Sequence, residues 1–140
     1  MMPAMRERGT TLVETAVVMA VLLAIMFGVI DFGRALYTYS FVANAAREGA
    51  RWAIVRGSKC TLLDHCPASS SDLQTYVRSL SEGATNPSSI TASLSFPSGG
   101  SNAPGSVAEV TVTYPFVFML PFMPSAGIKM TSTSEMVISN

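Results

Sequence analysis

A long apolar run near the N-terminus limits what this chain can fold into. Residues 16–30 read AVVMAVLLAIMFGVI, and residues 10–13 extend the run backwards across one acidic residue, Glu14. A helix over residues 10–30 would be roughly 31 Å long at about 1.5 Å per residue, close to the ~30 Å hydrocarbon thickness of a bilayer. The run therefore predicts one membrane-spanning helix.

A buried core helix and a cleaved secretory signal are the alternatives. A core helix would need other long apolar elements to cover it, and residues 31–140 contain none of comparable length. A secretory signal usually ends in a small-x-small cleavage site, whereas this run is followed by Asp31 and Phe32 and carries Glu14 near its front. We therefore expect the segment to stay attached to the residues that follow it.

The composition narrows the classes of function. The chain has 140 residues, which fits one domain, and its nine Lys and Arg residues balance nine Asp and Glu residues, so we expect no nucleic-acid partner. Charged residues make up 13% of the chain, well below the ~25% of soluble domains, which favours a membrane protein. With one His and two Cys, we expect no enzyme, no cofactor and no metal site.

Glu14 is unfavourable inside hydrocarbon, where an ionised carboxylate costs at least ~2.5 kcal/mol. The sequence RERG at residues 6–9 precedes it, and cleavage after Gly9 would create an α-amine on Thr10 and make Glu14 the fifth residue of the product. The amine of one subunit would then neutralise the carboxylate of a neighbour if their helices pack with an axial stagger. Glu14 would therefore be useful only in an assembly.

This arrangement resembles the class 3 prepilin-peptidase signal of type IV pilins. The resemblance continues through GTTLVETAVVMAVLLAIMFGVIDFGRALYTYSFVANAAREGARWA at residues 9–53, which is similar to the N-terminal segment of TadE-like pseudopilins of the tight-adherence (Flp) pilus systems. Its most distinctive parts are the sequence DFGR at residues 31–34 and NAAREGAR at residues 44–51. The similar segment is roughly a third of the chain.

The resemblance implies a structural minor pilin or pseudopilin that is trimmed after Gly9 by an aspartyl prepilin peptidase. Gly9, Thr10 and Glu14 are then the processing residues, and Glu14 sets the axial register between subunits. The implied partners are the prepilin peptidase, an assembly ATPase with its membrane platform, related pilin or pseudopilin subunits, and membrane lipid.

The helical pattern continues beyond the apolar run. Apolar residues recur at 4-3-4-3 spacing from Phe32 to Ala53, and Gly57 supplies the first C-terminal stop, so the sequence predicts one helix over residues 10–56, about 70 Å long. Small side chains on its second half would let either another subunit's helix or this chain's own C-terminal domain approach closely. These small residues are Ala45, Ala46, Gly49, Ala50 and Ala53.

Asp31 and Arg34 lie three residues apart at the predicted membrane border, where an exposed helical ion pair contributes a few tenths of a kcal/mol. Together with Glu14 and three of the small residues, they form the set expected in subunit packing. The complete set is Glu14, Asp31, Arg34, Ala46, Gly49 and Ala50.

Cys60 and Cys66 enclose five residues in the sequence SKCTLLDHC. A local disulfide is the preferred interpretation, because an even pair at short spacing suits an oxidising compartment. Zinc bound by both thiols with Asp64 and His65 is the competing interpretation, but these four ligands crowd into seven residues. Unpaired thiols are the third possibility.

Residues 58–140 predict a small α+β domain. Residues 72–80 predict a short helix, and period-two alternation predicts strands over residues 90–96, 107–118 and 130–138. The expected fold class is therefore α+β, in which the long helix packs on an antiparallel meander of about three strands with one short helix.

The apolar run at residues 114–123 contains Pro115 and Pro121, and it is too short and too broken to span a membrane. It predicts either core packing against the long helix, or an edge strand with a surface patch for a partner.

Charge counting leaves the orientation open, because Arg6 and Arg8 precede the span while Arg34 and Arg47 follow it closely. The cysteine pair and the resemblance favour a cytoplasmic N-terminus, a span in the inner membrane and an extracytoplasmic domain. The leading hypothesis is a TadE-like pseudopilin. The alternative is an uncleaved single-span protein whose outer domain binds a ligand or an envelope component.

Overall fold

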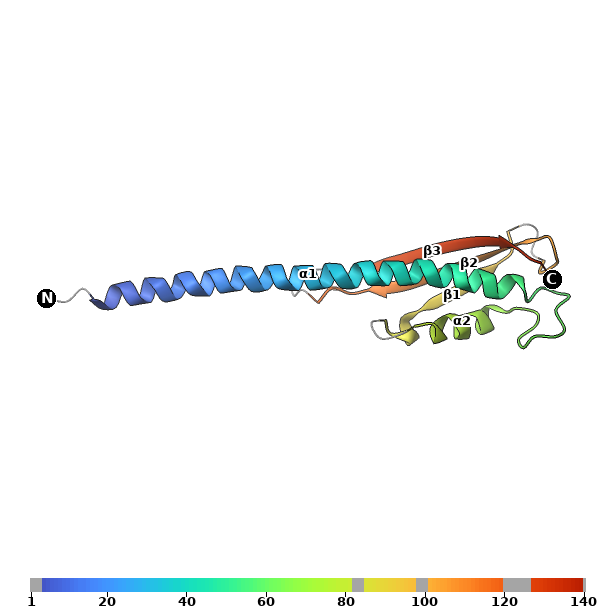
Figure 1. The fold of residues 1–140 in the computed structure, drawn as a ribbon, viewed down its shortest axis with the longest axis horizontal. Coiled ribbons are helices and arrows are strands. Elements are labelled where there is room, and N and C mark those ends of the chain that lie inside the picture. Colours follow the sequence, from blue (N-terminus) through green and yellow to red (C-terminus); the bar gives the residue numbers. More distant parts are fainter. Residues whose placement is uncertain (1–3, 82–84, 98–100, 120–126, 140) are drawn as a thin grey trace.

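The computed structural model describes residues 4–81, 85–97, 101–119 and 127–139. A single helix, α1 (Ala4–Ile54), runs the length of the molecule, and its second half lies along a small domain near the C-terminus (Figure 1). The remaining elements are α2 (Ser70–Ser79), a 3-10 turn η1 (Pro87–Ser89), β1 (Thr91–Ser95), β2 (Val107–Phe116) and β3 (Ile128–Val137). The predicted α+β fold is confirmed.

The ends of the helices differ slightly from the prediction. Helix α1 begins at Ala4 and passes through Gly9 without a break, because one glycine lowers helix stability by only about 1 kcal/mol. It ends at Ile54, whose carbonyl oxygen accepts a hydrogen bond from the backbone N–H of Ser139 (3.1 Å). Helix α2 begins at Ser70 because the Ser69 hydroxyl caps it by accepting from the Asp72 N–H (3.2 Å).

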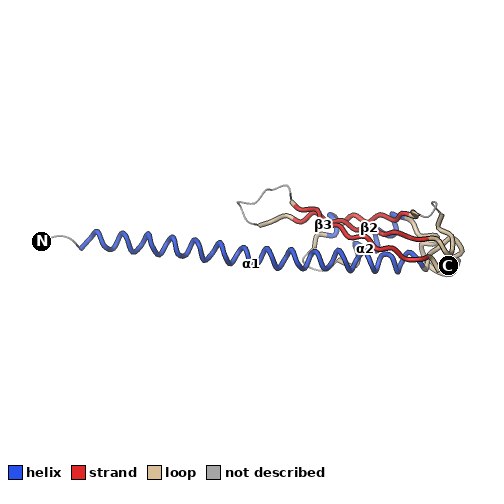
Figure 2. The backbone as a smooth tube through the Cα atoms, turned by 90° about the horizontal axis from the view of Figure 1, so that it is seen from above, coloured by secondary structure: helices blue, strands red, loops and turns tan. Residues whose placement is uncertain are grey.

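The three strands form an antiparallel sheet in the order β1-β2-β3 and run beside the second half of α1 (Figure 2). Strand β2 is therefore central, as the predicted meander implies, and the alternative of an edge strand does not hold for the start of the apolar run. Pro115 is tolerated because pairing with β1 ends at Thr113, so the proline lies where β2 is paired with β3 alone. Residues 120–123 of that run, Pro121 included, lie outside the described residues.

The two faces of the sheet differ in polarity, as period-two alternation requires. One face carries rows of hydroxyl side chains, with Thr111 and Thr133 joined by an Oγ1–Oγ1 hydrogen bond of 3.0 Å and Thr113 and Thr131 by one of 3.1 Å. The other face is apolar: it packs on α1 through β2 and β3, and on α2 through β1. The core therefore lies between the sheet and the two helices.

The second half of α1 is itself part of that core. Its small residues allow the sheet and α2 to approach the helix backbone closely. A Cβ atom built on Gly49 would lie 3.1 Å from a methyl group of Val110 in β2 and 3.2 Å from one of Leu73 in α2. The core cluster consists of Val42, Ala45, Ala46, Ala50, Ala53, Leu73, Val77, Ile90, Ala92, Val110 and Val112.

Replacing Gly49 by leucine should lower the free energy of unfolding by about 1–3 kcal/mol, because the new side chain overpacks a filled site. Urea unfolding of the full chain in detergent, followed by circular dichroism, would measure the loss. Gly33→Leu is the matched control, since a Cβ built at Gly33 meets no heavy atom of the described chain within 4 Å. Equal effects at the two glycines would contradict the close contact between α1 and the sheet.

Candidate functional site

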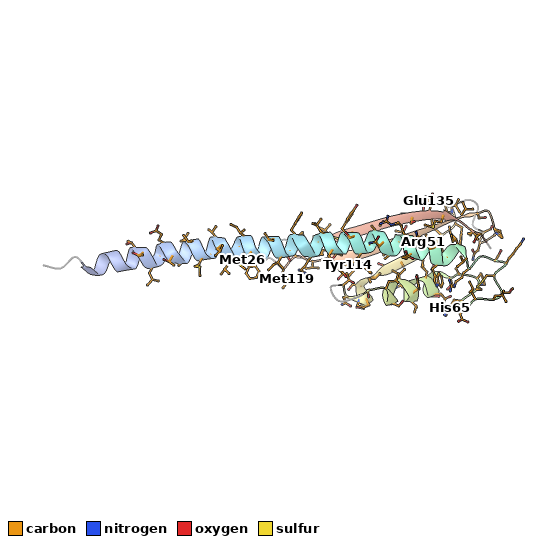
Figure 3. All side chains as sticks on the ribbon, viewed as in Figure 1. Met26, Arg51, His65, Tyr114, Met119 and Glu135 are labelled. Carbon is orange, nitrogen blue, oxygen red and sulfur yellow. A yellow bond between two sulfur atoms is a disulfide. The ribbon has the colours of Figure 1, made fainter. Side chains whose placement is uncertain are left out.

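The first half of α1 exposes apolar side chains on all sides. Residues 10–27, 29 and 30 are all exposed, and side chains project both above and below the helix around Met26 in Figure 3. Among the described residues, α1 is the one helix long and apolar enough to cross a membrane. A helix that is apolar all round needs an apolar environment, so this segment is a candidate membrane anchor.

The three predicted processing residues lie on this exposed part of α1. Gly9, Thr10 and Glu14 are all exposed, and a Cβ built on Gly9 meets no atom of the described chain within 4 Å. Glu14 lies between large apolar side chains, with Val13 before it and Val17 one turn after it, both exposed. The Glu14 carboxylate is therefore positioned to meet a group from outside the chain.

The small residues Ala46, Gly49 and Ala50 lie at the contact between α1 and the chain's own domain. All three are buried within the chain, where the sheet and α2 cover them. Of the two interpretations left open by the sequence, packing against the chain's own domain is the one that the structure contains. Small side chains permit close approach without specifying the partner, and the nearest apolar face was that of the chain itself.

Asp31, also predicted to take part in subunit packing, has hydrogen-bond partners within the chain. Asp31 is 2% exposed, and its Oδ1 atom accepts a hydrogen bond from Arg34 Nη1 at 2.8 Å. The other oxygen, Oδ2, accepts from the backbone N–H of Met119 at 2.9 Å. The pair with Arg34 is therefore one part of a buried junction rather than an exposed surface ion pair.

Two aromatic rings complete this junction. The guanidinium group of Arg34 lies 5.4 Å from the ring centre of Phe116, which is a cation–π distance. Phe118 contacts Phe116 edge to face, with 5.2 Å between the ring centres. The end of β2 is thus attached to α1 at the border between its exposed apolar half and its packed half.

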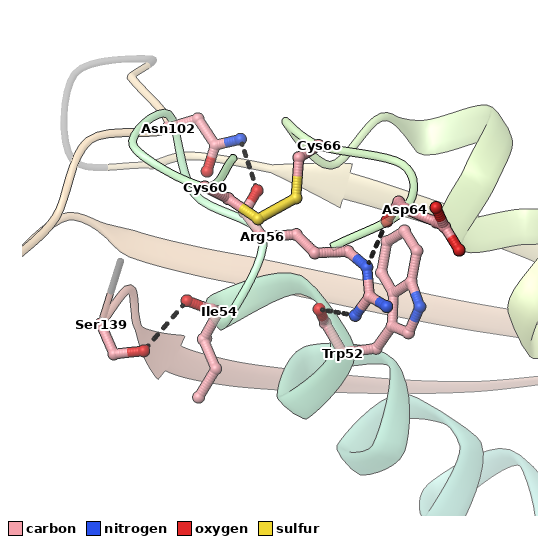
Figure 4. Close-up of a disulfide and its surroundings, with 8 residues drawn as sticks. All are labelled: Trp52, Ile54, Arg56, Cys60, Asp64, Cys66, Asn102 and Ser139. Carbon is pink, nitrogen blue, oxygen red and sulfur yellow. Dashed lines mark hydrogen bonds between the residues drawn. A yellow bond between two sulfur atoms is a disulfide. The ribbon is translucent and has the colours of Figure 1, made fainter. Parts of the chain in front are cut away.

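Cys60 and Cys66 form a disulfide in the loop after α1, with their Cα atoms 5.7 Å apart (Figure 4). A disulfide leaves neither sulfur available as a thiolate ligand for zinc. The loop is further held by Arg56, which stacks over Trp52 at 4.4 Å and donates from Nε to the Asp64 carbonyl oxygen at 3.0 Å.

A shallow surface depression adjoins this loop. His65 Nδ1 lies 3.1 Å from Asp72 Oδ1, beside the stacked rings of Trp52 and Tyr76, whose centres are 5.5 Å apart. The depression is lined by Trp52, His65, Asp72, Thr75, Tyr76 and Ser79. No sequence pattern predicts this group, because its members come from three separate segments of the chain. The one local indication is Ser69, which caps α2 and thereby places Asp72 in the first turn of the helix.

Replacing Asp31, which is 2% exposed, by alanine should lower the free energy of unfolding by about 1–3 kcal/mol, because it leaves Arg34 and the Met119 N–H without their acceptor. Chemical denaturation of the full chain in detergent would measure the loss. Glu48→Ala is the control: Glu48 forms a similar i,i+3 pair with Arg51 at 3.1 Å, but it is exposed, so its loss should cost less than about 1 kcal/mol. A loss at Asp31 no larger than that at Glu48 would contradict the buried junction.

Comparison with known proteins bears on α1 alone. No curated protein and no solved structure is significantly similar to the chain. Residues 9–51 match the family model described as TadE-like protein, roughly a third of the chain. This match covers the exposed apolar half of α1 and most of its packed half, and it confirms over this segment the resemblance to TadE-like proteins seen in the sequence.

Proposed function

We propose that this protein is a minor pilin or pseudopilin of a tight-adherence (Flp) pilus system, held in the inner membrane by residues 10–30. The observation that carries the proposal is the continuity of α1, in which an apolar segment containing one acid becomes the core helix of a small domain. Because no flexible joint separates the two halves of α1, the position of the membrane segment fixes the position of the domain. It acts as a structural subunit rather than as a catalyst.

Processing after Gly9 is part of the proposal. Gly9 is the weakest helix former of the segment around it, at about 1 kcal/mol less favourable than alanine. Because its surroundings are open, local unwinding of this turn for a membrane peptidase disrupts no packing with the described part of the chain. The products are a nine-residue basic leader and a subunit that begins at Thr10, with the domain outside the cytoplasm.

Glu14 then acts between subunits. Its exposed carboxylate lies in an apolar surface, where a lone charge is unfavourable once lipid or other helices cover it. The new α-amine of a neighbouring subunit would compensate the charge at one axial offset between the helices, and would thereby set their register. The partners under this proposal are a prepilin peptidase, an assembly ATPase with its platform, and related pilin subunits.

The alternative is an uncleaved single-span protein whose outer domain binds a ligand or an envelope component. The depression beside the Trp52 and Tyr76 rings favours it, because aromatic faces next to hydroxyl and carboxylate groups are suited to binding small polar molecules. Processing and the role of Glu14 distinguish the two proposals.

The intact mass of the protein purified from membranes of its native host tests the processing step. We expect the mass of residues 10–140, with any N-terminal modification added, because residues 1–9 are removed. The matched control is a Gly9→Leu variant, which should keep the full-length mass, since a bulky side chain would replace the small residue at the cut. Full-length mass for the unmodified protein would support the uncleaved alternative.

Glu14→Gln should abolish incorporation into the assembly while leaving the protein in the membrane, because the amide keeps the shape and removes the charge that the neighbour's amine would pair with. Immunoblots of sheared filaments and of membranes would measure the two fractions. Glu48→Gln, an exposed acid on the domain part of α1, should behave like the unchanged protein. Normal incorporation of the Glu14 variant would overturn the proposed register.

A further inference from the structure

The domain exposes large apolar side chains where the β2–β3 hairpin leaves the sheet. Val117 is 52% exposed, Met119 is 69% exposed, and Ile128 at the start of β3 is 52% exposed. Together these three residues form the hairpin patch. In Figure 3, Met119 lies on the side of the domain that faces the N-terminal half of α1, between Tyr114 and Met26 along the helix.

The hydrogen bond at Asp31 fixes the level of this patch along α1. The Met119 N–H is 2.9 Å from Asp31 Oδ2, and Asp31 directly follows Ile30, the last residue of the apolar run. The hairpin patch is therefore level with the end of the candidate membrane anchor. The apolar surface of α1 also continues at this level, because Phe32 and Leu36 are both more than half exposed.

The polar groups at this level have partners inside the chain. Asp31 accepts from both Arg34 and the Met119 backbone, so its charge is compensated without water. The buried hydroxyl of Thr38 donates to the Arg34 carbonyl oxygen at 2.9 Å. Satisfied polar groups beneath exposed apolar side chains are compatible with the boundary of a bilayer, where unpaired backbone and charged groups are unfavourable.

We propose that the hairpin patch inserts into the lipid of the same membrane that α1 crosses, at the boundary between head groups and acyl chains. The occupant is lipid because the patch lies beside the end of a helix segment that is apolar on all sides, where Phe32 and Leu36 are also exposed. Arg34, whose side chain is 38% exposed, lies at the same level, where a long basic side chain can reach the head groups. The protein then contacts the membrane at two places, through the α1 anchor and through the hairpin patch.

This second contact rests on the membrane anchoring in the proposed function, and it adds a constraint to it. A single span leaves the tilt of the helix free, whereas a patch attached to one side of α1 favours the orientation that brings this side into contact with lipid. Before assembly, the contact would hold the domain in one orientation relative to the membrane surface.

Tryptophan fluorescence of the full chain in phosphatidylcholine vesicles tests the contact. The chain has one tryptophan, Trp52, so Trp52→Phe supplies a dark background that keeps a ring stacked on Tyr76. In this background, Met119→Trp should lose at least half of its emission when the lipids carry bromine near the head-group end of the acyl chain, and less when bromine lies at the chain centre. Val117→Trp should behave in the same way and covers a folding failure of the first variant.

Two positions serve as controls at a low protein-to-lipid ratio. Phe27→Trp, in the apolar run, should be quenched by bromine at the centre of the acyl chain. Absence of this quenching would contradict the proposed membrane anchor. Glu135→Trp, on β3 at the far end of the domain in Figure 3, should be quenched by acrylamide and not by bromolipid.

Bromolipid quenching of Phe27→Trp together with acrylamide quenching alone at positions 117 and 119 would overturn the lipid contact while leaving the anchor intact. Shielding of positions 117 and 119 that appears only when the protein is crowded in the vesicle would identify a neighbouring copy as the occupant, and would also overturn it.

Discussion

The packing of the sheet onto the small residues of α1 is the interaction on which the rest of the structure depends. Ala46 and Ala50 are fully buried, and Gly49 leaves room for methyl groups of Val110 and Leu73. A helix in water is stabilised mainly by burying one face, and a sheet of three strands needs a partner for its apolar face. Each therefore supplies the surface that the other requires.

Attachments at both ends hold this contact in register. At one end the Ile54 carbonyl oxygen accepts from the backbone of Ser139, and at the other Asp31 accepts from the backbone of Met119. Between them the sheet lies along about 23 residues of helix, roughly 35 Å at 1.5 Å per residue. The apolar half of α1 is thus the continuation of a helix that the domain already holds rigid, rather than a separate tether.

Much of this fold follows from local patterns in the sequence. The unbroken apolar run predicts the exposed helix, and period-two alternation predicts all three strands to within a few residues of their observed ends. The sequence predicts a helix that begins at Thr10 rather than at Ala4, because Gly9 marks a change in composition but does not end the helix. The central position of β2 follows from the predicted three-strand meander, whereas Pro115 on its own favours an edge strand.

The contacts that matter most for the candidate site were not predictable in this way. The hydrogen bond between Met119 and Asp31 joins residues 88 positions apart, and no local periodicity in the sequence predicts it. The small residues of α1 showed that something approaches the helix closely, but side-chain volume does not identify the partner. For Glu14, the sequence alone indicates an unfavourable charge within an apolar run. Under the proposed function its partner belongs to another molecule.

Residue-resolved amide hydrogen exchange of the full chain in detergent micelles tests most directly whether the second half of α1 and the sheet form one unit. We expect the amides of residues 42–53 in α1 and those of Val110 and Val112 in β2 to open with the same free energy, that of global unfolding. If the helix amides stay protected while the β2 amides open at a clearly lower free energy, the helix is stable without the sheet, and the two do not form one unit.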